Sequence, residues 1–310
     1  MSNYVVMNTN IATLLKPKYS MPLWYIGDER FLPELNEINY FRLIFVEAGA
    51  GIVRLNDRRR VFLAPSIFCL NDQDQPELEK SNDLKAKAFY FHPKIINSIY
   101  NFENIRRNNR QDFSETEFQD QLFFRPFLLR FDQYGGQLNI GPVTAKRVIE
   151  LIDRVCKELD EQSDRYWACR SRSTFIELLF LIIRIFETPG TFGHSNLPEL
   201  GNQDVDLVIL YLHSNYEQKI TLSQLTNVFH INRTTINRRF AEVTGMSIMT
   251  YLQALRIQLA SVMLRETNLP ILEVMNKVGF NDPTHFGRVF RKHTGFAPSD
   301  YRQQYCWMIK

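Results

Sequence analysis

Hydrophobic residues recur at helical spacing through the last third of this 310-residue chain. The longest such pattern runs from Ser247 to Arg265 and, at 1.5 Å per residue, predicts a helix roughly 28 Å long. Its apolar positions are Tyr251, Leu252, Leu255, Leu259, Met263 and Leu264. Two shorter helical patterns, 221–229 and 270–278, lie before and after it. The spacing therefore predicts an all-helical C-terminal domain.

Each short pattern is followed by a second helix, and these two helices read as copies of one another. The first begins at Asn232 and the second, fifty residues later, at Asp282, and both residues are suited to cap a helix. Each copy has two apolar residues four apart and a glycine just past its end. The apolar pairs are Ile236 with Phe240 and Phe286 with Phe290, and the glycines are Gly245 and Gly295. In both copies an arginine falls two residues after the first apolar position, so we expect Arg238 and Arg288 to face solvent.

A short helix, a tight turn and a second, exposed helix form a helix-turn-helix unit, and this order occurs twice. A connecting helix of the predicted length can hold two reading helices about one DNA turn apart, roughly 34 Å, in successive major grooves. A plain six- or seven-helix bundle with surface arginines would show the same periodicity. The two capped helices, with arginines at one register, favour DNA binding.

Charge is divided unevenly along the chain. Residues 204–310 hold twelve Lys or Arg against eight Asp or Glu, a net charge of +4, whereas residues 1–203 hold twenty-five against twenty-six. The positive charge lies with the duplicated motif, as neutralisation of DNA phosphates requires.

The most specific pattern of the chain is Val278-Gly-Phe280 followed by the run from His285 to Arg302. Together with the residues from Gly245 onward, it closely resembles the DNA-binding domain of AraC/XylS transcription regulators. The resemblance covers about a third of the chain, from about Asp204. It implies two helix-turn-helix subdomains joined by a long helix, each inserting its second helix into the major groove. It also implies a regulator, more often an activator, that contacts RNA polymerase.

The resemblance assigns DNA-facing positions on both reading helices. Arginine can donate to guanine O6 and N7, asparagine can pair with adenine, and threonine can contact thymine. The predicted base-reading residues are Thr234, Asn237, Arg238, Thr284 and Arg288. The predicted contacts to the DNA backbone are Arg233, Arg239, Arg291 and Lys292, for which simple surface charge is the alternative. Pro283 and Gly287 have no side-chain donor, so we expect the second helix to read fewer bases.

Four positions depart from the family pattern. Thr226 and Met275 stand where a small residue is expected, His230 where glycine is usual in the first turn, and Ile248 where proline is common. None of these departures removes a DNA-facing group, so they concern local packing.

Residues 188–203 are rich in Pro and Gly and lack helical spacing, which predicts a linker. We therefore predict an effector-binding and dimerisation domain at 1–187 and a DNA-binding domain at 204–310. Two helical patterns, Val143–Leu159 and Arg172–Phe186, precede the linker with a polar turn near Gln162. This helical hairpin resembles the dimerisation element of the family, although the two apolar stripes can equally pack on each other and on a sheet.

Residues 20–92 instead show short β-rich runs separated by turn residues. The predicted strands are Phe41–Glu47, Gly51–Leu55, Arg60–Leu63, Ser66–Leu70 and Ala86–Phe91, with Asn56-Asp57 as a hairpin turn. Strands at this spacing predict a small β-barrel, and the resemblance implies a cupin-like sensor. Strand alternation and polar aromatics suggest an effector pocket, with ordinary barrel packing as the alternative. Its candidate residues are Trp24, Tyr25, Tyr40, Arg42, Arg54 and Tyr90.

Several function classes find little support. The four cysteines lack metal-finger spacing, and the N-terminus has no secretory signal pattern, which indicates a cytoplasmic protein with reduced thiols. The most apolar run, Phe175–Phe186, is too short to cross a bilayer. His92 is the only histidine of the β-rich region, whereas a metal site needs three or four ligands. We expect no metal, cofactor or catalytic residue.

These observations predict an α+β two-domain protein: a cupin-like β-barrel with a helical hairpin, followed by an all-α domain with two helix-turn-helix motifs. The predicted function is sequence-specific regulation of transcription at promoter DNA, controlled by an unidentified small-molecule or protein effector. A homodimer and a monomer both stay open. Two alternatives stay open. One is a cupin-type metal enzyme fused to a DNA-binding domain, and the other is a non-specific architectural DNA binder.

Overall fold

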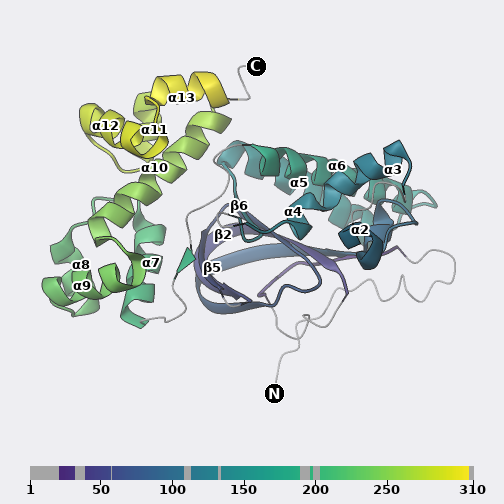
Figure 1. The fold of residues 1–310 in the computed structure, drawn as a ribbon, viewed down its shortest axis with the longest axis horizontal. Coiled ribbons are helices and arrows are strands. Elements are labelled where there is room, and N and C mark those ends of the chain that lie inside the picture. The colour runs from purple at the N-terminus through teal and green to yellow at the C-terminus, as the bar shows by residue number, and fades with distance from the viewer. Residues whose placement is uncertain are drawn as a thin grey trace.

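The computed structural model describes residues 21–31, 39–56, 58–107, 113–131, 134–188, 196–197 and 203–306. Figure 1 shows two parts side by side: an N-terminal part in which a curved β-sheet lies beneath a layer of helices, and a C-terminal part made of helices alone. The predicted α+β two-domain class is confirmed.

The described strands of the N-terminal domain form one antiparallel sheet. They are β1 (Leu23–Ile26), β2 (Phe41–Leu55), β3 (Arg58–Leu63), β4 (Ser66–Leu70), β5 (Pro76–Phe91), β6 (Gln137–Asn139) and β7 (Asn196–Leu197). The neighbour order is β1-β5-β2-β3-β7, and β4 pairs with both β2 and β6. Among the described strands, β2 and β3 form a hairpin, whereas the other pairs join strands that are not consecutive in the chain.

β2 is a single strand where the sequence predicted two, Phe41–Glu47 and Gly51–Leu55. Between those runs its pairing with β5 shifts register, and Gly49 has a φ of +92°, which favours glycine. A bulge of this kind interrupts the alternation of apolar and polar residues that predicts a strand. The interruption explains why β2 was wrongly predicted as two strands.

The predictions for the neighbouring strands differ in their success. β3 and β4 agree with the predicted runs, whereas β5 begins at Pro76 instead of Ala86. Residues 76–85 pair with the second half of β2. Because they are mostly polar, they lack the apolar alternation that predicts a strand. Asn56, with a φ of +54°, lies between β2 and β3 as predicted for the hairpin turn, while Asp57 lies outside the described residues.

Alternate residues of the strands face two different hydrophobic cores. Odd-numbered positions near the start of β2 pack with β5 against the helices, whereas Ile44 and Val46 pack into the opposite face of the sheet. The helix-facing side chains include Phe41, Leu43, Phe45, Phe89 and Phe91, and the opposite core includes Phe31, Phe62, Phe68 and Tyr90. The sheet is therefore buried on both faces at its centre.

Helices cover the first of these faces. The predicted hairpin is confirmed as α5 (Pro142–Glu161) and α6 (Trp167–Glu187), with Gln162 left-handed at the end of α5. α6 begins before the predicted Arg172 because Trp167 is buried and its carbonyl accepts a hydrogen bond from Ser171 Oγ at 2.9 Å. Five shorter helices, none of them predicted from the sequence, are η2 (Pro93–Ile95), α2 (Phe102–Arg107), α3 (Glu115–Asp120), η4 (Gln121–Phe124) and α4 (Arg125–Leu128).

The C-terminal domain contains the five helices predicted from apolar spacing and two more at its ends. They are α7 (Gln203–Asn215), α8 (Leu222–Phe229), α9 (Arg233–Thr244), α10 (Ile248–Glu266), α11 (Ile271–Lys277), α12 (Pro283–Thr294) and α13 (Pro298–Tyr305). α10 joins the two helix-turn-helix units (Figure 1). Most of the predicted linker at 188–203 lies outside the described residues, so the domain limits stay a prediction.

The two domains share a buried interface. Ala50, Ile52 and Val61 of the sheet belong to the same hydrophobic core as α7, α8, α9 and the start of α10. The core of the second helix-turn-helix unit contains only residues of the C-terminal domain. The first unit is therefore attached to the sheet, while the second is joined to it through α10.

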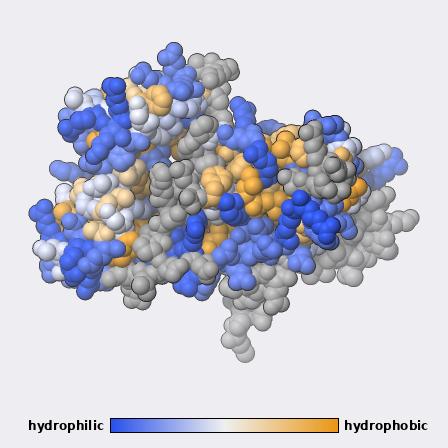
Figure 2. All heavy atoms as spheres, viewed as in Figure 1, coloured by the Kyte–Doolittle hydropathy of each residue, from blue (hydrophilic) through white to orange (hydrophobic). Residues whose placement is uncertain are grey.

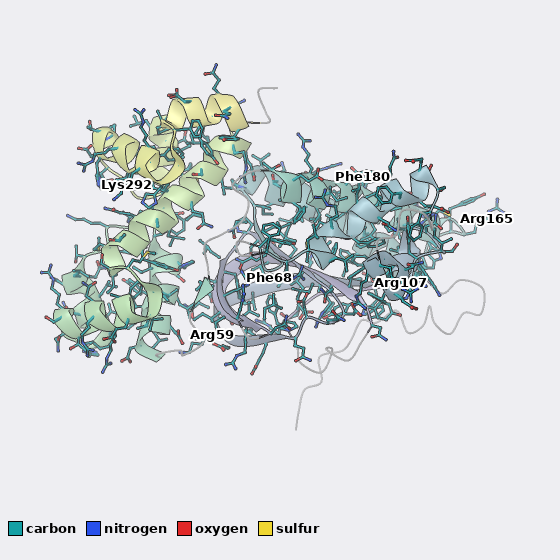
Figure 3. The ribbon with its side chains drawn as sticks, viewed as in Figure 1. Arg59, Phe68, Arg107, Arg165, Phe180 and Lys292 are labelled. Carbon is teal, nitrogen blue, oxygen red and sulfur yellow. The ribbon has the colours of Figure 1, made fainter. Side chains whose placement is uncertain are left out.

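Charged groups add to this interface at two places. Arg59, labelled in Figure 3, lies 2.7 Å through Nη2 from Asp206 Oδ2 on α7, and 2.7 Å through Nε from Glu79 Oε2 on β5. The side chains of Arg59 and Asp206 are each only 4% exposed. At the far end of α10, the buried Glu266 carboxylate lies against Gly141, where any Cβ would collide with it.

Within the described residues, no helix combines the length and the hydrophobicity needed to cross a bilayer.

Candidate nucleic-acid interface

The reading helices α9 and α12 begin with the predicted capping residues. Asn232 accepts a hydrogen bond from the backbone N–H of Thr235 at 2.8 Å, and Asp282 accepts one from His285 N–H at 2.6 Å. Each bond satisfies one of the backbone donors left free at a helix start. The two helices therefore start in the same way, fifty residues apart.

They also end in the same way. Gly245 and Gly295 have φ values of +73° and +82°, the left-handed conformation expected at a helix end. Before each glycine a threonine hydroxyl donates to the helix: Thr244 Oγ1 to Phe240 O at 2.7 Å, and Thr294 Oγ1 to Phe290 O at 2.9 Å. The duplication is thus visible in hydrogen bonds as well as in sequence.

Each reading helix buries its apolar pair and exposes the opposite side. Ile236 and Phe240 are 2% and 0% exposed. Thr234 and Arg238 on α9 are exposed, and so are the matching Thr284 and Arg288 on α12. Four of the five predicted base-reading residues therefore lie on open helix surface.

The arginines of α9 differ in what holds them. Arg238 Nη1 lies 2.6 Å from Glu242 Oε1, one turn further along α9, and both side chains are more than half exposed. Arg239 Nη1 contacts Asp204 Oδ2 on α7 at 2.5 Å. Arg233 is exposed at the first position of the helix. Arg238 is thus held only by a weak surface pair, whereas Arg239 links two helices of its own domain.

Asn237, the fifth predicted base-reading residue, is only partly exposed. Its Oδ1 accepts a hydrogen bond from the backbone N–H of Ile248, at the start of α10, at 3.2 Å. Pairing with adenine needs both the oxygen and the nitrogen of the amide. Asn237 therefore holds the start of α10 with the same oxygen that pairing with adenine would use.

α12 presents fewer functional groups, as predicted. Pro283 occupies its first turn, and a Cβ built on Gly287 would meet no atom within 4 Å. Arg291 and Lys292 are exposed in the last turn, and Figure 3 shows Lys292 on the helical part of the molecule that contains α11 to α13. Arg288 is therefore the one long polar side chain in the middle of the exposed face of α12.

Arg256, which the sequence analysis did not single out, connects the two units. It lies midway along α10, where its Nε donates to Tyr216 O at 2.8 Å and its Nη2 donates to Gln218 O at 2.6 Å. Its guanidinium also lies 5.9 Å from the ring centre of Phe280, just before α12. One side chain thus contacts the loop before α8 and the turn before α12. The sequence feature that could have identified Arg256 is a charged residue between the apolar positions of α10.

Only part of the predicted effector pocket comes together. Trp24 lies 4.1 Å from Tyr40 and 5.5 Å from Tyr90, measured between ring centres. The Tyr90 hydroxyl donates to Glu29 Oε2 at 2.8 Å, a buried acid that the sequence analysis missed. Burial raises the pKa of Tyr90, so this hydroxyl keeps its proton. These three aromatic rings form the Trp24–Tyr40–Tyr90 cluster.

The other pocket candidates lie apart from this hydroxyl or are already engaged. Arg42 is buried and donates to the backbone carbonyl of Asp74. The Tyr25 hydroxyl donates to Asp160 on α5 at 2.6 Å. Arg54 pairs with Glu79 at 2.6 Å. Tyr25 and Arg54 therefore make contacts away from the aromatic cluster.

The described residues contain no group of three or more His, Cys, Asp or Glu side chains placed to hold a metal ion. His92 caps the short helix η2 by accepting from the backbone N–H of Lys94 at 3.1 Å. Cys69, Cys156, Cys169 and Cys306 are free thiols.

Comparison with known proteins agrees with this arrangement. A helix-turn-helix domain family matches residues 225–304. The chain is 24% identical over 267 residues to the HTH-type transcriptional activator RhaR of Cronobacter sakazakii, covering 86% of this chain and 85% of that protein. It is 35% identical over 98 residues to an uncharacterized HTH-type transcriptional regulator, YdiP, of Escherichia coli, covering 32% of each.

Among solved structures, the DNA-binding domain of AdpA in complex with a target DNA is similar to 34% of this chain and 94% of that one, with 24% identity and a TM-score of 0.33. The relatives that match along most of their length are transcription activators, and this chain combines an N-terminal β-sheet domain with a C-terminal domain that holds two helix-turn-helix units. The helix-turn-helix match over residues 225–304 and the similarity to these activators over 86% of the chain support a DNA-binding transcription regulator of the AraC/XylS type.

Proposed function

We propose that α9 and α12 enter successive major grooves of one promoter duplex. The observation that carries this proposal is the repeat of two identically capped helices with an exposed arginine at the same register, Arg238 and Arg288. Thr234 and Thr284 add contacts to bases one helical turn before the arginines. Asn237 adds another contact once its hydrogen bond to the start of α10 is broken. Arg233, Arg239, Arg291 and Lys292 then contact phosphates.

The surface chemistry supports this assignment. Figure 2 shows hydrophilic side chains over the lobes that carry α8 and α9 and, above them, α12. Polar and basic surface of this kind suits phosphate contacts, whose strength depends on salt. The similarity to transcription activators extends the proposal to activation through contact with RNA polymerase, in the cytoplasm where bacterial promoters lie.

The first test selects genomic fragments with the purified full-length chain and sequences them. We expect a recurring site with two short boxes about ten base pairs apart, one helical turn. Binding of the best fragment is then followed against salt and against a scrambled duplex. Tight binding without a recurring site would favour an architectural role over a specific regulator.

We further propose that the chain dimerises through the α5–α6 hairpin. Phe180 on α6 is 61% exposed, and the partly exposed Ile176 and Ile183 lie on the same side one turn before and after it. Phe123 of η4 packs on Phe180 with ring centres 4.6 Å apart. Figure 2 shows hydrophobic side chains gathered over the region of α4 to α6, and a second copy of the same apolar face is the simplest cover for it.

Sedimentation of the full-length chain tests this proposal. We expect Phe180→Glu to convert a dimer to a monomer, whereas the control Leu272→Glu, on a 57% exposed residue of α11, leaves the dimer intact. A wild-type monomer at every concentration would exclude this interface.

A further inference from the structure

A cavity of about 720 Å³ lies between the sensor domain and the DNA-binding domain. Its walls come from β3 and β6 on one side and from α7, α10, α12 and α13 on the other. The volume is within the range of roughly 300–1,000 Å³ that is usual for small-molecule sites. No residue of the Trp24–Tyr40–Tyr90 cluster lines it. The cavity is therefore separate from the pocket predicted in the barrel.

The wall of this cavity carries no formal charge at neutral pH. None of the described residues that line it is Lys, Arg, Asp or Glu. Burial lowers the pKa of His213 to about 3 and also lowers the pKa of His293, so both imidazoles are neutral. An ion placed here would lose its hydration without gaining an opposite charge. The wall therefore suits an uncharged occupant.

Three side chains of the wall have hydrogen-bonding groups that nothing in the described part of the chain uses. The Nδ1 atom of His213 is buried without a partner, while its Nε2 lies 2.8 Å from the Tyr251 hydroxyl. Asn139 engages only its Oδ1, which accepts from Gln137 Nε2 at 3.4 Å. The Gln258 amide makes no hydrogen bond within the described residues. A buried polar atom left unpaired is unfavourable, so His213 Nδ1 points to an occupant that bonds with it, and the partly exposed amides of Asn139 and Gln258 offer further groups on the same wall.

We propose that this cavity binds an uncharged, amphipathic small molecule. Its apolar body packs on Val61 of the sheet and on Leu255 and Val262 of α10, all of which are buried lining residues. Its hydroxyl or carbonyl groups bond with the free groups of His213 on α7, Asn139 on β6 and Gln258 on α10. The molecule therefore contacts both domains at once.

The position of the cavity gives the occupant a route to DNA binding. Its wall follows α10, the helix that joins the two reading units, from Thr250 to Val262. A molecule that changes how α10 lies on the sheet changes the affinity for DNA, and by linkage DNA changes the affinity for that molecule by the same factor. This effector role rests on the proposed function, whereas the existence of the site does not.

Titration of the full-length chain with Nile red, an uncharged dye that fluoresces in apolar surroundings, tests the site without DNA. We expect saturable binding of one dye per chain. Ala254→Trp on α10 and Asn139→Trp on β6 fill the cavity from opposite sides, and each should raise the dissociation constant at least tenfold. Val228→Trp, on an exposed residue of α8 outside the cavity, is the matched control. Circular dichroism checks that each variant is folded.

The chemical class is tested on the unaltered chain by displacement of the dye. Uncharged 2-naphthol should displace Nile red at a concentration at least tenfold lower than 2-naphthalenesulfonate does. Equal displacement by the anion would overturn the proposed class, even if neither tryptophan variant folds. No saturable binding, or binding unchanged in a folded cavity-filling variant, would overturn the site. Because no arm uses DNA, failure here is distinct from failure of the DNA-binding proposal.

Discussion

Arg256 contacts both helix-turn-helix units, and we expect its removal to weaken DNA binding only when both reading helices are on DNA. Its guanidinium donates two hydrogen bonds to backbone carbonyls of the loop before α8, at 2.8 Å and 2.6 Å. Hydrogen bonds from a charged donor contribute about 1.5–3 kcal/mol each, and the lower value applies because the side chain is only partly buried. Arg256→Ala should therefore lose about 3 kcal/mol of the energy that holds the units in register.

This loss translates into affinity only through the second unit. One factor of ten in affinity corresponds to about 1.4 kcal/mol, so 3 kcal/mol sets a ceiling of roughly 100-fold. We expect Arg256→Ala to weaken binding to a two-box duplex by roughly 10- to 100-fold, because the second reading helix is no longer held in position to enter the next major groove. Binding to a duplex whose second box is scrambled should change less than threefold.

Fluorescence anisotropy with end-labelled duplexes measures both effects. A series of duplexes with one or two base pairs added between the boxes should show a sharp optimum for the wild-type chain and a flatter profile for Arg256→Ala. Arg256→Lys is the matched control, since it keeps the charge but lacks the rigid guanidinium whose Nε and Nη2 each reach one carbonyl. Equal losses on one-box and two-box duplexes would refute the register argument and indicate general destabilisation.

Three further predictions concern single contacts. Arg238→Ala should lose roughly 1–3 kcal/mol of binding free energy on the selected site and little on random DNA, and equal losses on both would make the arginine a phosphate contact. Glu242→Gln should tighten binding to the selected site about twofold, because it removes an exposed ion pair with Arg238 that is worth about 0.3–0.5 kcal/mol. Arg59→Ala should lower the free energy of unfolding, measured in urea, by about 3 kcal/mol, because the buried Asp206 carboxylate would keep only Lys80, at 3.5 Å, as an ion-pair partner. Arg59→Met combined with Asp206→Leu should recover most of that loss, and a double variant as unstable as Arg59→Ala would contradict this explanation. Because the pKa of folded His213 lies near 3, below its unfolded value, stability present above pH 6.5 should fall as the pH drops towards 3, and less so in His213→Gln; acid titrations that coincide would count against it.

The local elements of the DNA-binding domain were readable because they depend on nearby residues. Caps such as Asn232 and Asp282 bond to backbone three residues away, and the apolar pair of each helix repeats within one turn. His230 shows the limit of such local rules. It takes the left-handed conformation usual for glycine, with a φ of +55°, so the turn keeps its shape despite the unusual residue.

Features that join distant parts of the chain were not readable. Ala50, Ile52 and Val61 look like ordinary strand residues, and only the fold reveals that they complete the core of the first helix-turn-helix unit. Arg256 looks like surface charge until the loop before α8 is placed beside it. The cavity between the domains likewise depends on how the domains are arranged. The spacing of residues along one strand or helix does not predict that arrangement.

The contact between Gly141 and Glu266 means that one domain places a charged group at a helix start of the other. α5 begins at Gly141 without a capping side chain, so its first N–H groups and the positive end of its dipole would face water if the domains came apart. The Glu266 carboxylate, from the last turn of α10, brings negative charge to that helix start. Such a charge is worth up to about 2 kcal/mol in a partly buried setting. Opening the interface therefore removes a stabilising charge from the helical hairpin itself, and the sensor domain becomes less stable each time it releases the domain that binds DNA.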